Sequence, residues 1–543
     1  MRGQLNLAIC AFVIVASLIL GGGARGGYLS DAVLQFFSIP CLLFFVWQLQ
    51  NHTNWSLPKK ELSFCAALFL LPLIQLVPLP TAIWKSLPNR DLSSAALELI
   101  GAAEQWAPIS ISPRATWLSV LSLLPPLAVF IGTVQLTHSQ RRKLSIVILI
   151  AGLISVFVGL LQVAQGPNSP FRFFVYTNAS EAVGFFANRN HFAALLYSLM
   201  LFAAAWTLSS VMAAGSADEQ NRFDARYIVP LIASFTVFVA LVGAQAMARS
   251  RAGLGLTILA LLGSLALTFR QERGASSATS TKVILGATAL ALVFSMQFAL
   301  YRFMERFDAD PLADARVAFA RNTITAAKAA MPFGTGMGTF VPVYAAFEKT
   351  EDTIIDTFAN HAHNDALELW LETGAFGIIL MALYLIWYLA RARKVWWRQL
   401  EPNAGIDEVL VRSATLVIAL LIAHSFVDYA LRTGAMMAIF AFSCALLVQA
   451  PAENHPRRAT HVRKNRDSAV EDGPAAATAA IPKQKASSLN RPSPTGQLKH
   501  GDVTSSNAGE RWGKDIVWPD AWREPSQQEA QAKTPDPSSK PEK

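Results

Sequence analysis

Apolar residues occur along this chain in long runs that are separated by polar stretches. Each run is dominated by Leu, Ile, Val, Phe and Ala and extends over about 18 to 22 residues, the length at which a helix crosses a hydrocarbon core of about 30 Å. Twelve such runs occupy residues 5–22, 30–48, 62–80, 116–135, 144–164, 190–212, 227–246, 252–269, 282–300, 370–390, 410–427 and 433–450. The pattern predicts an all-α polytopic membrane protein with about 12 transmembrane helices.

The composition favours a membrane protein over a soluble one. Of the 543 residues, 53% are apolar and 15% are charged, whereas a typical soluble domain has about 25% charged residues. A soluble enzyme with these runs would need a hydrophobic core larger than one domain supplies. The four cysteines, Cys10, Cys41, Cys65 and Cys444, lie inside apolar runs, which predicts small buried hydrophobic residues rather than a disulfide framework or a zinc site.

The distribution of Lys and Arg predicts the orientation of the helices. The chain carries 46 Lys and Arg against 37 Asp and Glu, a net charge of +9, and the positive-inside bias explains this excess without a nucleic-acid partner. Five alternate loops carry Lys59, Lys60, Arg141, Arg142, Lys143, Arg222, Arg226, Arg270, Arg273, Lys282, Arg391, Arg393, Lys394 and Arg398. With twelve spans these loops share one side, so we expect that side and both termini to be cytoplasmic.

The opposite side is expected to carry the longer connections, at residues 81–115, 165–189 and 301–369. Loops longer than about 15 residues in a compact protein are usually functional or disordered. In the third loop, residues 310–331 are compatible with a helix, and the breaker-rich sequence PFGTGMG follows at 332–338. We therefore expect a partly helical cap in this loop.

The composition changes sharply after residue 452. Pro, Ser, Ala, Lys, Asp and Gln replace the aliphatic residues, and such a segment cannot bury enough apolar area to offset its ordering entropy. We expect 452–543 to be a disordered cytoplasmic tail. Trp512, Trp518 and Trp522 leave open a short docking segment within it.

The densest polar cluster lies where the third loop re-enters the membrane. His361, His363, Asn364, Asp365 and Glu372 fall within twelve positions, and ionisable groups at a membrane boundary are costly unless they face a wet cavity. The two histidines would share one face of a strand but lie about 200° apart on a helix, where His361 would face away from His363. No third ligand has a zinc-site spacing. A general base and an interfacial helix cap both remain open readings of His363.

Two further clusters precede predicted spans. Asn188, Arg189, Asn190 and His191 stand before the span at 190–212, where they could cap the helix or bind a ligand. Arg251 lies in a tight turn between two spans. An arginine at that depth needs an anionic partner, either a ligand phosphate or a lipid headgroup.

The predicted helix of the third loop carries Arg316 and Arg321. Their spacing of five separates them by about 140° on a helix, so one can face the membrane-boundary pocket while the other is solvated. Asp308 and Asp310 have the DxD form of many metal-dependent sugar transferases, but three residues are a weak signal and ordinary loop solvation is the favoured explanation.

Together these segments resemble the O-antigen ligase and polymerase superfamily of bacterial inner-membrane glycosyltransferases. The central match is His363-Asn364 followed, after nine residues, by Gly374 and, after two more, by Gly377. Supporting segments are GFFANRN before a span, SRAGLGL after one, Arg316 with MPFGTGMGTF in the loop, and HSFVDYALR at 424–432. The resemblance covers roughly 140–450.

The resemblance implies transfer of a glycan from an undecaprenyl diphosphate carrier on the periplasmic side, with no metal, nucleotide sugar or other cofactor. His363 falls on the base of the family, and Arg251 and Arg316 fall on arginines that would hold the diphosphate, which suits the fork of an arginine. Asn364 could orient the His363 ring. The remaining candidates for substrate binding are Asn188, Arg189, Asn190, His191, Asn364, Arg321 and His361.

The apolar runs, the resemblance and the change of composition together divide the chain into N-terminal transmembrane helices with their loop 81–115 (1–140), a ligase-type catalytic domain with its loop 301–369 (141–450), and the tail (452–543). The resemblance covers the second of these. It implies a multi-pass protein of the bacterial inner membrane whose partners are membrane lipids, the lipid-linked donor and a saccharide acceptor. The 81–115 loop is a candidate for choosing that acceptor.

The acceptor itself stays open between several classes. The complete 363–377 signature favours an O-antigen ligase that uses lipid A core. A polymerase of O-antigen or exopolysaccharide is the alternative, and transfer to protein is a further one. A transporter is disfavoured because no repeat of halves is visible and the polar residues gather at one surface. A scaffold would not need converging Arg and His.

Overall fold

A computed structural model gives the fold of this chain. The residues it describes are 2–24, 27–50, 58–175, 177–215, 224–268, 286, 311–353, 358–398 and 405–451. Several predictions fall outside them, namely nearly all of the span at 282–300, the Asp308–Asp310 pair, and the tail with its tryptophans.

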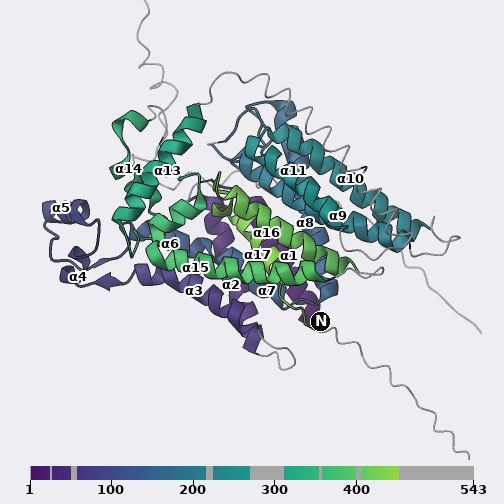
Figure 1. Ribbon diagram of the computed structural model, residues 1–543, viewed down its shortest axis with the longest axis horizontal. Helices are drawn as coiled ribbons and strands as arrows, with labels where there is room; N and C mark the ends of the chain where they lie inside the picture. The colour runs from purple at the N-terminus through teal and green to yellow at the C-terminus, as the bar shows by residue number, and fades with distance from the viewer. Residues whose placement is uncertain are drawn as a thin grey trace, which may run out of the picture. The chain divides into compact units, whose positions relative to one another are not determined.

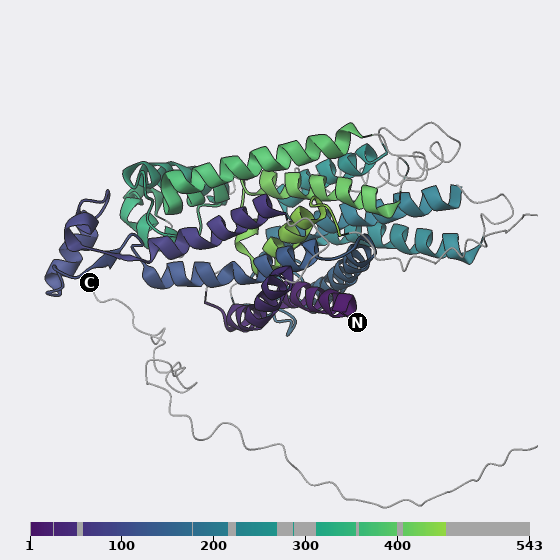
Figure 2. The same ribbon diagram turned by 90° about the horizontal axis from the view of Figure 1, so that it is seen from below.

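The described residues are mainly α-helical (Figures 1 and 2). The helices are α1 Arg2–Leu20, α2 Leu29–Gln50, α3 Lys59–Gln75, α4 Thr81–Lys85, α5 Asp91–Leu99, α6 Pro113–Ser122, α7 Leu124–Val134, α8 His138–Gln165, α9 Arg189–Gly215, α10 Ala225–Ala248, α11 Arg251–Ala266, α13 Pro311–Ala329, α14 Phe340–Phe347, α15 Asp365–Trp397, α16 Ile406–His424 and α17 Gly434–Leu446. Two short 3-10 helices, η2 Thr350–Asp352 and η3 Ala430–Arg432, and the strands β1 Pro78–Leu79 and β2 Ala107–Pro108 complete the described elements.

The helices agree with a polytopic membrane protein. Within the described part of the chain, seven segments are long and apolar enough to cross a membrane: α1, α2, α6 together with α7, α8, α9, α10 and α15. The shorter apolar helices α11 and α17, and also α3 and α16, coincide with four more predicted runs. The helical membrane architecture is therefore confirmed, and the total of twelve spans stays a prediction.

The lipid-facing surface can be recognised on α15. Phe376, Ile379, Leu383 and Ile386 are all large, apolar and exposed, and their spacing of three and four places them along one face of the helix. A water-soluble helix would not present such a stripe without a partner. This face is the one we expect to contact the hydrocarbon core.

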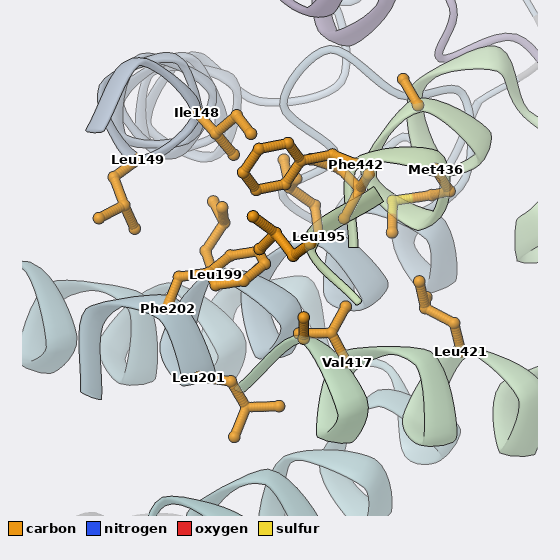
Figure 3. Packing of buried hydrophobic residues seen from close by; sticks show 14 of the residues in the cluster. Ile148, Leu149, Leu195, Leu199, Leu201, Phe202, Val417, Leu421, Met436 and Phe442 are labelled. Atoms are coloured by element: carbon orange, nitrogen blue, oxygen red, sulfur yellow. The ribbon is translucent and has the colours of Figure 1, made fainter. Parts of the chain in front are cut away.

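The core is built around α9, whose apolar residues cover all sides of the helix, as is typical of a buried helix. It packs against α8, α10, α11 and α16. In Figure 3, side chains of α9 lie among side chains from α8, α16 and α17. Those drawn with labels are Leu195, Leu199, Leu201 and Phe202 of α9, Ile148 and Leu149 of α8, Val417 and Leu421 of α16, and Met436 and Phe442 of α17.

The helix ends gather at two levels. At one level α9, α11 and α15 begin while α1, α3, α10 and α16 end; we call this the polar end. Backbone hydrogen bonds join its members: the Ala187 N–H donates to the Gly22 carbonyl at 3.0 Å and the Ala182 N–H to the Met247 carbonyl at 3.2 Å. The side chains of the candidate functional site lie at this end.

Of the basic residues that predicted the orientation, those in the described part of the chain lie at the other level, the basic end. Arg141, near the start of α8, donates to the Val448 carbonyl after α17 at 2.7 Å, and Arg391 of α15 pairs with Glu61 of α3 at 2.6 Å. The described basic loops therefore share one end of the helices, as the alternation predicted.

The connection between α3 and α6 is folded. Its strands pair antiparallel with Pro78 opposite Pro108, and the Trp84 indole N–H donates to the Pro108 carbonyl at 2.9 Å. In Figure 2, α4 and α5 lie beyond the end of α3 and the start of α6. The predicted loop 81–115 is thus an ordered module at the polar end.

The glycine-rich segment after α13 fits closely onto α15. The helix predicted at 310–331 is confirmed as α13, and Gly334 and Gly336 after it have φ values of +76° and +107°. The Gly336 N–H donates to the Glu372 carbonyl at 2.9 Å, and a Cβ on Gly334 would lie 2.6 Å from that same oxygen. Only glycine tolerates both the conformation and the close approach, so this segment fixes the loop helices against the start of α15.

Candidate functional site

His363 stands immediately before α15 in a non-helical segment. Its φ is +49°, and Asn364 is the N-cap of α15, because its side-chain oxygen accepts from the backbone N–H groups of Ala366 and Leu367 at 3.1 Å. The expectation that His361 would face away from His363 on a shared helix is therefore wrong. Both imidazoles contact the Tyr429 ring, at centroid distances of 4.2 Å for His361 and 4.9 Å for His363.

The partner that orients His363 is Asp428, in the connection between α16 and η3. His363 Nδ1 lies 3.1 Å from Asp428 Oδ1, whereas the side-chain NH₂ of Asn364, the residue expected to orient the ring, donates to the Phe426 carbonyl at 3.2 Å. The ring also stacks on Phe319 of α13, with centroids 5.9 Å apart. His363 is therefore held by groups from three separate parts of the chain.

The Asp428 carboxylate is completely buried. Its Oδ1 accepts from the Tyr429 backbone N–H at 2.9 Å, and its Oδ2 accepts from the Asn190 side chain. Burial alone would raise the pKa of Asp428, but the hydrogen bond to His363 and the neighbouring imidazoles hold this pKa well below its ordinary value. The group is an anion at neutral pH. Asp428 lies in the segment HSFVDYALR, and its place as the only carboxylate in that segment is the signal that could have identified it.

An open cavity of about 320 Å³ adjoins His363. Its lining residues are Arg316, Val317, Ala320, Ala362, His363, Asn364, Phe426 and Val427. Among the residues that the structure describes, Arg316 has no hydrogen-bond or ion-pair partner. A guanidinium and an imidazole thus face the same space, and the guanidinium is available to an anion.

The two arginines of α13 diverge as their spacing predicted. Arg316 lines the cavity, whereas Arg321 is half-exposed and pairs with Asp352 at 2.8 Å. Arg321 is not among the cavity-lining residues, so the structure does not bring it to His363 with the other predicted binding residues.

The four polar residues at the start of α9, 188–191, have different roles: some cap or anchor the helix, and others contact the candidate site. Asn188 caps α9 by accepting from the Asn190 N–H at 2.8 Å, and Arg189 pairs with Glu181 at 2.6 Å. Asn190 reaches Asp428, as described above. His191 is fully buried against the Tyr429 ring, with a centroid distance of 4.8 Å.

Arg251 is joined to the same end of the bundle through its neighbour. It is the exposed first residue of α11, and Ser250 caps that helix by accepting from the Gly253 N–H at 2.9 Å. The Ser250 hydroxyl also donates to Asn190 at 2.7 Å, which links α11 to Asp428. Arg251 itself is not among the residues that line the cavity.

A second polar network lies on α15 beside the first. Arg432 of η3 pairs with Glu372 at 2.8 Å, with Asp365 at 3.4 Å and with Glu368 at 3.5 Å, and His361 Nδ1 lies 2.8 Å from Glu368. Burial alone would lower the pKa of His361, but the Glu368 carboxylate raises it above its ordinary value. Sequence reasoning missed Glu368 and Arg432, because a carboxylate on a helix and an arginine 64 positions away have no motif in common.

The described residues contain no group of three or more His, Cys, Asp or Glu side chains arranged to hold a metal ion. What they do contain is a histidine fixed by a buried carboxylate, which is the arrangement of a general base, beside an arginine that can bind a phosphate.

Comparisons with known proteins identify the same region. A search of curated proteins finds no match to this chain. A family model described as O-Antigen ligase matches residues 236–382, a range that includes Arg251, Arg316 and His363 but not Asp428 or Arg432. Over this range, which is about a quarter of the chain, the sequence is similar to the O-antigen ligase family.

Proposed function

We propose that the protein transfers a glycan from an undecaprenyl diphosphate carrier to a saccharide hydroxyl, as an O-antigen ligase whose acceptor is lipid A core. The observation that carries the proposal is the shared cavity of His363 and Arg316, with Asp428 behind the imidazole. The family implies a lipid-linked donor and a saccharide acceptor in general terms.

The proposed reaction is a displacement at the anomeric carbon of the donor sugar. The acceptor hydroxyl oxygen forms the new glycosidic bond while its proton passes to the neutral nitrogen of His363, Nε2. The bond from the anomeric carbon to the diphosphate oxygen breaks, and undecaprenyl diphosphate leaves with its charge matched by arginine. Asp428 stabilises the imidazolium that forms, as a buried carboxylate does beside other catalytic histidines.

We further propose that this chemistry occurs on the periplasmic face of the inner membrane, with both termini in the cytoplasm. The support is that the cavity residues lie at the polar end while the described basic loops lie at the basic end. An alkaline phosphatase fusion after residue 345 should be active and one after residue 275 inactive, with the converse for a cytoplasmic fluorescent reporter. Equal reporter activity at both positions would contradict this topology.

The role of Arg316 is tested by substitution. Arg316→Lys keeps the charge but loses the planar fork, so we expect a higher KM for the donor and turnover reduced by about tenfold or more, with a larger loss for Arg316→Ala. The assay uses purified full-length protein and lipid diphosphate-linked glycan extracted from a strain that lacks the protein. Arg226→Lys is the matched control, since Arg226 pairs with Asp224 at 3.2 Å at the basic end. Unchanged kinetics of Arg316→Ala would remove Arg316 from the site.

The same assay tests metal independence. Turnover should persist in EDTA; loss on chelation with recovery on adding Mg²⁺ or Mn²⁺ would transfer the chemistry to a metal site.

The acceptor is tested in a deletion strain, from the lipid-linked material that accumulates there. Polymer accumulating on the carrier is expected for a ligase. Single repeat units on the carrier would instead identify a polymerase.

A further inference from the structure

Tyr429 is an aromatic residue whose ring contacts three histidines of the polar end. The residue is 3% exposed, and its ring centroid lies 4.2 Å from that of His361, 4.8 Å from that of His191 and 4.9 Å from that of His363. The contacts with His363 and His191 are edge-to-face, with interplanar angles of 77° and 82°. This is a favoured geometry for aromatic pairs and is sensitive to ring orientation.

The position of Tyr429 is fixed by Arg432, three residues later in the chain. The three carboxylates that pair with Arg432 come from Asp365, Glu368 and Glu372, whose spacing of three and four places them on one face of α15. Glu368 and Glu372 are at most 1% exposed. A buried ion-pair group of this kind tolerates little displacement, because each lost contact leaves a charge without a partner. The segment 428–432 is therefore held tightly against α15.

His361 closes the network on its other side. Its Nδ1 lies 2.8 Å from Glu368 Oε1, and the Ala362 N–H donates to Glu368 Oε2 at 2.9 Å. His361 does not line the cavity, so its ring meets Tyr429 rather than the space where a substrate would bind. The Glu368 carboxylate at this distance also raises the pKa of His361 above its ordinary value.

We propose that Tyr429 is a positioning residue for His363: its ring, fixed by the Arg432 network and by His361, sets the orientation of the His363 imidazole toward the cavity. Asp428 holds only one point of that ring, Nδ1, and leaves rotation about the hydrogen bond open. The His363 ring contacts the Tyr429 ring and also stacks on the Phe319 ring, and these two contacts restrict that rotation. This inference rests on the proposed role of His363 as the base.

The test compares two substitutions at Tyr429. Tyr429→Phe keeps the ring and loses the hydroxyl, which accepts from Asn360 at 3.3 Å; Tyr429→Leu removes the ring. We expect Tyr429→Phe to keep kcat within about threefold of the native enzyme and Tyr429→Leu to lose about 10² in kcat with KM unchanged, since small misplacement of a reacting group has effects of that size. Equal loss in both variants, or native kcat in Tyr429→Leu, would overturn the proposal.

A second measurement does not depend on turnover. Diethyl pyrocarbonate modifies accessible imidazole nitrogens, and mass spectrometry of the full-length protein gives the rate at His363. We expect Tyr429→Phe to be modified at the native rate and Tyr429→Leu several-fold faster, because the ring is released. Equal rates in all three proteins would overturn the positioning role. If transfer is absent from the native protein while the labelling rates differ as expected, the proposed function fails and the positioning of His363 stands.

Glu368→Gln tests the same network without removing the Tyr429 ring, and it serves if Tyr429→Leu does not reach the membrane. It keeps the size of the side chain and removes the charge opposite His361. We expect kcat to fall in the same direction, by less than the about 10² of the ring deletion, with faster labelling of His363. Native kcat and native labelling in Glu368→Gln would show that the network does not act on His363.

Discussion

Replacing His363 by Ala is expected to lower the rate of transfer by about 10² to 10⁴, because a positioned general base contributes about that factor. The imidazole lines the cavity and has a buried carboxylate on its Nδ1, and no neighbouring side chain in the described lining can accept a proton in its place. The residual rate in His363→Ala would come from binding and from charge stabilisation of the leaving diphosphate. The measurement is the initial rate with extracted lipid-linked donor.

The matched control is His138→Ala. His138 is the exposed first residue of α8 at the basic end, so its loss should leave the rate unchanged. Abundance in the membrane should be equal for both variants, since His363 has solvent access and a small side chain does not collapse the site. Full transfer by His363→Ala would contradict its role as the base and leave it as an interfacial residue before α15.

The helices could be predicted from the sequence because their signal is local. An apolar run of sufficient length has few alternatives in a membrane, where every backbone polar group must be satisfied within the segment. The loop helix α13 was equally readable, since PFGTGMG ends it within the sequence itself. The divergence of Arg316 and Arg321 followed from the geometry of a helix alone.

The partners in the site could not be predicted in this way. His363 and Asp428 are 65 positions apart, and their contact depends on how α15 begins beside the end of α16, where the Asp365 N–H donates to the Ser425 carbonyl at 2.8 Å. The expectation about His361 failed for a local reason: α15 begins only after its Asn364 cap, so the two histidines precede the helix.

Asp428→Asn is expected to reduce kcat by about 10² to 10⁴ while KM changes little. The carboxylate accepts a hydrogen bond from His363 Nδ1–H, and that tautomer leaves Nε2 free to take a proton from the acceptor. An amide at this position can instead donate to Nδ1, which favours the tautomer with a proton already on Nε2; the same exchange at other catalytic histidines costs about 10⁴. Asp428 is well suited to this role, because its strongly lowered pKa keeps it an acceptor at any pH near neutrality.

The size of Asn makes the substitution informative, since with its NH₂ group toward His363 the remaining side-chain oxygen still accepts from Asn190 and only the hydrogen bond from the Tyr429 N–H is lost. Asp224→Asn is the control: Asp224 caps α10 through the Arg226 N–H at 2.9 Å, and Asn caps a helix equally well. Asp428→Ala should lose activity too, but it removes a buried group with several partners and also lowers thermal stability. The diagnostic result is an Asn variant with native abundance, native melting temperature and a strongly reduced kcat. An Asn variant with native kcat would mean that Asp428 serves packing alone and that another group sets the tautomer of His363.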